Sequence, residues 1–327
     1  AAPPPEQPPP GAAQPAPTVP RESGGSPFFA RELTHYLRSA GGRTPPPMDL
    51  EAMLVARLGA LPPPALRLLE TLAVAGRPTS QQEILAASGL PAEGAVHVAR
   101  LKAEHLIRVT GTDREPLLET FHDRIREAAL GQIETPRLRR THRRLADVIS
   151  AALQVPFDDL ARGALAGGSA NGSPAGVGIS PRDWQRIFDL ANHYSAADEY
   201  DRALVFALLA AEQARRQHSL DIAERQYQIA SQASDEADAA TRYRIARGLG
   251  EIRMRRGNYR AARQTLEAAR HLAQGEPPLV TAEIEDALRE IAEVAVIEST
   301  SATGISIVSV ELVETIAAAD IDTVWTD

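Results

Sequence analysis

The sequence contains no cysteine among its 327 residues, which excludes disulfides and thiolate metal sites. Its single lysine, Lys102, lies in "ARLKAEH" without neighbouring glycines, so the Gly-rich, lysine-bearing loop that binds phosphate is missing. The chain also lacks an apolar run of about 18 residues and a basic, signal-like start. From these absences we expect a cytoplasmic protein that does not hydrolyse ATP on its own and has no membrane segment in residues 1–275.

Charge is distributed unevenly along the chain, although the formal net charge is only −8. Residues 276–327 hold twelve acidic residues and one basic residue, whereas the rest of the chain carries 31 acidic and 34 basic residues. Such a difference marks an acidic tail or a separate module. We therefore divide the chain into a proline-rich linker at 1–20, a first helical domain at 21–155, a mobile linker rich in glycine and serine at 156–180, helical repeats at 181–275 and the acidic tail at 276–327.

Periodic apolar residues predict that the fold is mostly α-helical. "SPFFARELTHYLRSAGG" predicts one helix, and "DLEAMLVARLGALPPPALRLLETLAVAG" predicts two more that are separated at prolines 62–64. Thr79 or Ser80 is expected to cap a short helix, which a turn at Gly89 separates from a helix over about 91–105. "LIRVTG" and "PLLETF" then predict a hairpin. This order of helix, turn, helix and hairpin is typical of a winged-helix domain.

Two segments near the end of the helical region align with each other, "LANHYSAADEYDRALVFALLA" with "LGEIRMRRGNYRAARQTLEAA". Tyr200 aligns with Tyr259 and Ala203 with Ala262, a pattern typical of tetratricopeptide repeats, in which small residues let paired helices approach closely. "SLDIAERQYQIA" supplies a middle element, so one helix must serve two pairs. The prediction is an irregular α-solenoid that binds a protein partner or a ligand, with a purely structural spacer as the alternative.

Four segments resemble successive landmarks of STAND signalling ATPases (signal transduction ATPases with numerous domains): "ESGGSPFFARELTHYL", "LVARLGALPPPALRLLETLAVAGRP", "LKAEHLIRVTG" and "FHDRIREAAL" with "RLRRTHRRLADVI". They are most similar to the members fused behind bacterial serine/threonine protein kinases. The resemblance implies the regulatory lid, winged helix and sensor of such an ATPase, which couple nucleotide state to partner binding and permit oligomerisation on activation. It assigns the phosphate loop to an upstream domain, so ATP or ADP would be bound only together with that domain.

The resemblance also implies three nucleotide-contacting residues. Gly25 and Pro27 in "SGGSPFF" match the family's Gly-x-Pro element, whose rigid proline packs near the adenine; the alternative is that this segment caps the helix beginning near Phe28. His122 in "ETFHDRI" resembles the winged-helix histidine that contacts the diphosphate of ADP, and the alternative is a plain helix-starting residue followed by Asp123. We expect no catalytic residue and no metal site, because His122 and Asp123 lack further ligands at a suitable spacing.

The runner-up function is a transcriptional regulator that reads DNA with the winged helix. The helix expected at 91–105 offers Arg100 and Lys102 beside Glu93 and Glu104, which is a poor set for compensating phosphate charge. The basic run "RLRRTHRR" at 137–144 is typical of a solvated helix face or of arginines that pair with neighbouring acids. A nucleic-acid partner is therefore not expected.

The tail combines a predicted helix, "TAEIEDALREIAE", with two strands joined at Gly304, which together make half of a ferredoxin-like α/β unit. "VTAEIEDALREIAEVAVIESTSATGISIVSVEL" resembles the first porter segment of resistance-nodulation-division efflux transporters, but the transmembrane helix that precedes it in that family is absent. The tail is thus either an authentic small module or the product of a junction near 275–278 with a porter fragment. The change in charge favours the junction.

Overall fold

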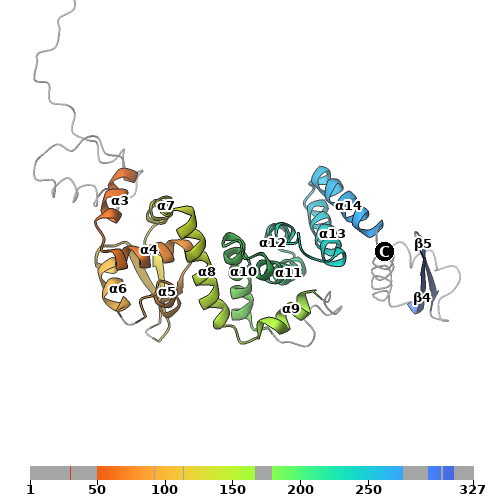
Figure 1. Ribbon diagram of the computed structural model, residues 1–327, viewed down its shortest axis with the longest axis horizontal. Coiled ribbons are helices and arrows are strands. Elements are labelled where there is room, and N and C mark those ends of the chain that lie inside the picture. Colours follow the sequence, from red (N-terminus) through yellow and green to blue (C-terminus); the bar gives the residue numbers. More distant parts are fainter. Residues whose placement is uncertain are drawn as a thin grey trace, which may run out of the picture. The chain divides into compact units, whose positions relative to one another are not determined.

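The computed structural model describes residue 30 and residues 50–91, 93–112, 114–165, 179–274, 294–302 and 305–312. These residues are mostly α-helical, with one small three-stranded antiparallel sheet (Figure 1), which confirms the predicted fold class at this level. They belong to two compact units, residues 1–141 and 142–327. Gly25 and Pro27 lie outside the described residues, as does the helix predicted after them apart from residue 30.

Helix α4 lies at the centre of the first unit, where it contacts α5, α6, α7 and strand β3. The described helices of this unit are α3 (Leu50–Gly59), α4 (Pro63–Ala75), α5 (Gln81–Ala87), α6 (Gly94–Ala103) and α7 (Asp123–Gly131), and α8 (Thr135–Ala151) continues into the second unit. Pro63 and Pro64 occupy the first turn of α4, where the missing N–H breaks no hydrogen bond. The predicted separation of two helices at these prolines is confirmed.

The sheet of the first unit contains the predicted hairpin and one strand that the sequence pattern did not predict. Strands β2 (Ile107–Gly111) and β3 (Pro116–Thr120) are antiparallel, with Ile107 opposite Thr120. The additional strand, β1 (Thr79–Ser80), pairs with β3, so the strand order is β1-β3-β2. The sequence did not predict β1, because a strand of two residues is too short to show alternating apolar and polar side chains. Ser80 does precede α5, but its side chain makes no capping hydrogen bond, so the predicted cap is wrong in that respect.

The second unit contains an array of helices, and short connections join those from α10 to α14. Its described helices after α8 are α9 (Phe157–Leu165), α10 (Pro181–Ala196), α11 (Tyr200–Arg216), α12 (Leu220–Gln232), α13 (Ala239–Arg255) and α14 (Tyr259–Gln274). Helix α9 corrects the prediction of a mobile linker over 156–180, because its first part is helical. Leu160 of α9 is fully buried, and the ring of Phe157 lies 5.6 Å from that of Phe206 in α11. Residues 166–178 lie outside the described residues.

Small residues lie where neighbouring helices of the array meet. Ala203 and Ala262, which align in the sequence, are both buried. A Cβ atom at Gly248 would lie 2.5 Å from the ring of Tyr227, and one at Gly250 would lie 2.6 Å from the side chain of Leu266. From α10 to α14 each helix contacts the next one along the chain, so α12 contacts both α11 and α13, as expected for a helix shared between two pairs.

Two strands of the tail are described, β4 (Val294–Ala302) and β5 (Ile305–Leu312), and they form an antiparallel hairpin (Figure 1). This pairing agrees with the strands predicted on either side of Gly304. Gly304 itself and the helix predicted before the hairpin lie outside the described residues. No helix in the described part of the chain combines the length and hydropathy needed to cross a bilayer.

Candidate functional site

His122 lies where strand β3 gives way to helix α7. It is the N-cap residue of α7, with an extended backbone, and its Nδ1 atom accepts a hydrogen bond from the backbone N–H of Arg124 at 3.3 Å. A ring nitrogen that accepts a hydrogen bond carries no proton, so the proton of the neutral ring is on Nε2. His122 therefore begins the helix, as in the alternative interpretation.

A cleft of about 330 Å³ opens beside His122 in the first unit. It is lined by the end of α4 and the residues after it, by β2 and β3, and by the start of α7; the lining residues are Leu72, Gly76, Arg77, Pro78, Arg108, Glu119, Thr120, Phe121, His122, Asp123 and Arg126. Three arginines thus face two carboxylates around the histidine. The first backbone N–H groups of α7 lie at the same place, and a helix N-terminus favours negative charge.

Arg126 connects α7 to the end of α4. Its Nε atom donates to the carbonyl of Ala73 at 3.0 Å, and its guanidinium packs over Gly76, where a Cβ atom would lie 3.0 Å from Nη2. Gly76 ends α4 in a left-handed conformation with φ of 71°, which glycine adopts without strain. A cation at the negative end of α4 is favourable, so Arg126 holds this wall of the cleft in position.

The other two arginines come from different elements. Arg108 of β2 lies opposite Glu119 of β3 in the hairpin register, and their side chains form an ion pair of 2.7 Å. Arg77 directly follows Gly76, and its side chain is half-buried. Glu119 pairs with Arg108, and the other charged groups of the lining are Arg77, Arg126 and Asp123. The cleft is suited to a small anion that accepts several hydrogen bonds.

Two arginines of the basic run at 137–144 pair with acidic side chains, as the second interpretation of this run expects. Arg137 pairs at 2.5 Å with Glu70, a carboxylate buried in α4. Burial raises the pKa of Glu70, and the charge of Arg137 opposes this rise. Arg143 pairs at 2.7 Å with Glu199 in the second unit. Part of the run therefore stabilises packing within each unit, whereas Arg139, Arg140 and Arg144 are exposed.

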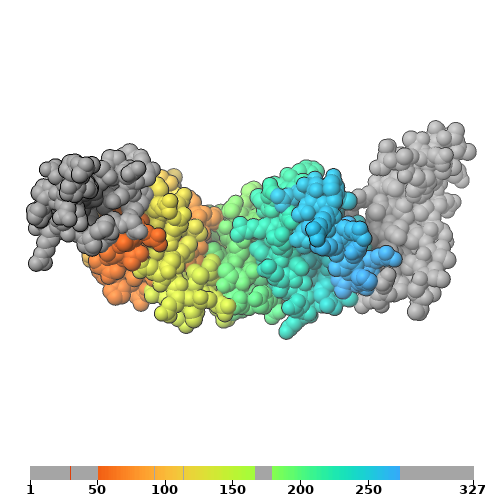
Figure 2. Space-filling model, turned by 90° about the horizontal axis from the view of Figure 1, so that it is seen from above, coloured from red at the N-terminus to blue at the C-terminus, as the bar shows by residue number. Residues whose placement is uncertain are grey.

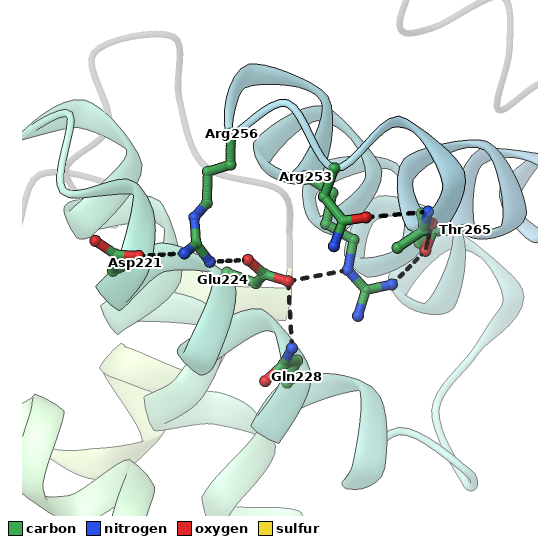
Figure 3. A network of polar contacts seen from close by, with 8 residues as sticks. Asp221, Glu224, Gln228, Arg253, Arg256 and Thr265 are labelled. Carbon is green, nitrogen blue, oxygen red and sulfur yellow. Dashed lines mark hydrogen bonds and ion pairs between the residues drawn. The ribbon is translucent and has the colours of Figure 1, made fainter.

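The second unit contains a network of charged groups centred on Glu224, which is nearly buried in α12 (Figure 3). Arg253 donates through Nε to Glu224 at 3.1 Å and through Nη1 to Thr265 at 2.6 Å. Arg256 forms ion pairs with both Glu224 and Asp221. The network thus connects α12, α13 and α14.

In the described ranges, no group of three or more histidine, aspartate or glutamate side chains has a geometry suited to a metal ion. Two histidines of the second unit do meet: Nδ1 of His142 lies 2.9 Å from Nδ1 of His193. One ring must donate and the other accept, so this pair is a hydrogen bond between two rings.

Neither the models of protein families, nor the curated protein sequences, nor the solved structures with which the chain was compared give a match. The interpretation of the cleft therefore depends on its own geometry. Sequence reasoning identified His122 but missed Arg77, Arg108 and Arg126, because these residues are far apart in the chain and converge only in the folded unit. The hairpin register could have placed Arg108 beside Glu119, but no sequence signal placed Arg126 at the end of α4.

Proposed function

We propose that the chain is the regulatory part of a multidomain signalling ATPase, of the kind linked to serine/threonine protein kinases, and acts in the cytoplasm. The observation that carries this proposal is the cleft in which His122 lies beside Arg77, Arg108 and Arg126 at the start of α7. In this proposal His122 donates from Nε2 to the diphosphate of ADP, while an upstream domain supplies the phosphate loop and the magnesium site.

The order of elements supports a winged-helix assignment of the first unit. Helix α4, strand β1, helices α5 and α6, and the hairpin β2–β3 follow one another, and the sheet order is β1-β3-β2. In this proposal the contact between His122 and a phosphate holds the first unit against the nucleotide. When the contact is lost, the unit can change its orientation, so that the orientation of the domain depends on which nucleotide is bound. Gly25 and Pro27 are proposed to contact the adenine side of the same nucleotide.

The helical array of the second unit is proposed to be an irregular tetratricopeptide-like solenoid that binds a partner. Small residues at the helix contacts and the shared helix α12 support this assignment. A DNA-binding role for the winged helix has weaker support, because Arg100 of α6 is paired at 2.9 Å with Glu104, and a groove-reading helix needs unpaired cations. We assign the chain no catalytic activity of its own.

Binding of inorganic pyrophosphate and of ADP to the chain tests the role of the cleft. With the upstream domain restored, we expect both anions to bind, measured by ³¹P NMR titration, and a loss of about tenfold in affinity for His122→Ala, because a charge-assisted hydrogen bond is removed. His97→Ala is the matched control, since His97 lies on α6 outside the cleft lining. Pro27→Ala should weaken ADP binding but not pyrophosphate binding.

Equal affinities for His122→Ala and His97→Ala would contradict the proposed diphosphate contact. Tight, magnesium-dependent capture of ATP by the chain would contradict the assignment of the phosphate loop to another domain, because such capture requires a lysine-bearing glycine turn.

A further inference from the structure

A second cleft, of about 260 Å³, lies at one edge of the helical array, where the start of α12 meets the turn between α13 and α14. Its lining is entirely polar and consists of Asp221, Glu224, Arg225, Gln228, Arg256 and Asn258. Arg256 reaches from the end of α13 to both Asp221 and Glu224 on α12 (Figure 3). These ion pairs keep the two sides of the cleft together without any ligand.

The cleft contains donors that the internal network does not use. Arg225 is exposed and has no hydrogen-bond or ion-pair partner among the described residues. Asn258 uses its Oδ1 atom to accept from the backbone N–H of Ala261 at 3.4 Å, so its Nδ2 group remains a donor. Glu224 is already bound by Arg253 and Arg256. The unused groups therefore favour a ligand that accepts hydrogen bonds, such as a carboxylate.

Three exposed apolar side chains are close in the sequence to residues that line the polar cleft. Ile222 and Met254 are each 48% exposed and Tyr259 is 71% exposed. Each lies within two residues of a lining residue: Ile222 follows Asp221, Tyr259 follows Asn258, and Met254 precedes Arg256 by two positions. Tyrosine, methionine and arginine are enriched at protein–protein interfaces. Exposed apolar side chains and the polar lining residues thus come from the same two segments, the start of α12 and the chain around the α13–α14 turn.

Charge complementarity indicates the kind of partner. Residues 239–274, which form α13 and α14, contain nine arginines and two glutamates. Both glutamates are paired, Glu251 with Arg255 at 2.6 Å and Glu267 with Arg263 at 2.8 Å. The surface of these two helices, cyan to blue in Figure 2, therefore carries an excess of positive charge. Such a surface attracts an acidic partner.

We propose that this edge of the array binds an acidic peptide segment of a partner protein. One carboxylate of the peptide is bound by Arg225 and by Nδ2 of Asn258, and a neighbouring apolar side chain packs against Tyr259 and Ile222. The proposal deepens the partner-binding role proposed for the array. It is independent of the His122 cleft, which lies in the other unit, so the two can fail separately.

Fluorescence anisotropy with the full chain and a labelled short peptide of glutamates and leucines tests this proposal. We expect saturable binding that weakens about tenfold for Arg225→Glu and for Tyr259→Ala, because each removes a central contact. Arg270→Glu is the matched control, since Arg270 is exposed on α14 outside the cleft, and it should change the affinity less than about twofold. Circular dichroism of every variant monitors folding.

Absence of peptide binding to the folded chain, or equal effects of Arg225→Glu and Arg270→Glu, would overturn the proposal. Equal binding of a peptide with glutamine in place of glutamate would also overturn it, because the surface would then select apolar ligands. Self-association of the chain that Arg225→Glu abolishes, measured by sedimentation, would assign the edge to a second copy of the chain instead.

Discussion

Tyr227 is a fully buried residue that connects three helices. Its hydroxyl group donates to Glu212 of α11 at 2.7 Å. Its ring packs against α13 at Gly248. Burial by itself would raise the pKa of Glu212, but the charge of Arg215 and the hydrogen bond from Tyr227 outweigh it and lower this pKa. The charged carboxylate is therefore stabilised inside the array, and the helix spacing depends on the absence of a side chain at residue 248.

Replacing Gly248 by alanine tests this close approach. Alanine favours a helix over glycine by about 0.5–1 kcal/mol, but a Cβ atom would lie 2.7 Å from the Tyr227 hydroxyl oxygen. Overpacking of this kind costs about 1–3 kcal/mol, so we expect a net loss of stability in urea unfolding of the second unit. Gly131→Ala is the control for a glycine without close neighbours, since a Cβ atom there meets nothing within 4 Å; it lies in the first unit, so its effect is read from the unfolding of that unit. Similar effects of both substitutions would contradict this packing.

The burial of the His142 ring makes stability depend on pH. Burial lowers the pKa of His142 from 6.5 to about 4. Between these values the unfolded chain binds a proton that the folded chain does not, so stability falls as the pH falls from 6.5 to about 4. The contribution of His142 over this range is about 1–3 kcal/mol.

We therefore expect His142→Gln to flatten the dependence of the unfolding free energy on pH in this window. His271→Gln replaces an exposed histidine of the same unit and should leave the slope unchanged. Denaturant unfolding at a series of pH values measures both slopes. Parallel curves for the original chain and His142→Gln would show that the burial of this ring does not control the acid sensitivity.

Among the elements, the junction of α4 with α7 positions the His122 cleft. Gly76 ends α4, and Arg126 of α7 binds the carbonyl of Ala73 near that end. Since Arg77 follows the same turn and His122 begins the same helix as Arg126, this single contact positions both sides of the cleft.

Replacing Arg126 by alanine should destabilise the first unit by about 1–2 kcal/mol, because a half-buried hydrogen bond from a charged donor is lost. Arg124→Ala is the control on the same helix. Arg124 is 65% exposed and pairs with Glu127 across the surface at 3.3 Å, so its loss should cost less than about 0.5 kcal/mol. Thermal unfolding followed by circular dichroism measures both, and a result in the reverse order would contradict the positioning role of Arg126.

Across the whole molecule, helices and strands with a strongly periodic sequence could be predicted. Contacts between residues that are far apart in the sequence could not. The leucines of α4 and the paired alanines of α11 and α14 predicted their helices, and the hairpin β2–β3 followed from two short apolar runs. Strand β1 was missed because it pairs with β3 only in the folded unit. Helix α9 was missed because its glycine and alanines resemble those of the linker that follows. Within the cleft, only His122 had a local signal.

The turns of the helical array restrict which helices can be inserted or deleted without moving the loops to the other edge of the array. Short connections reverse the chain direction at every step from α10 to α14, and α12 contacts the helix on either side of it. Removing α12 alone would invert the polarity of all that follows and carry residues 256–258 to the opposite edge. An insertion or deletion that keeps each loop at its present edge therefore adds or removes an even number of helices.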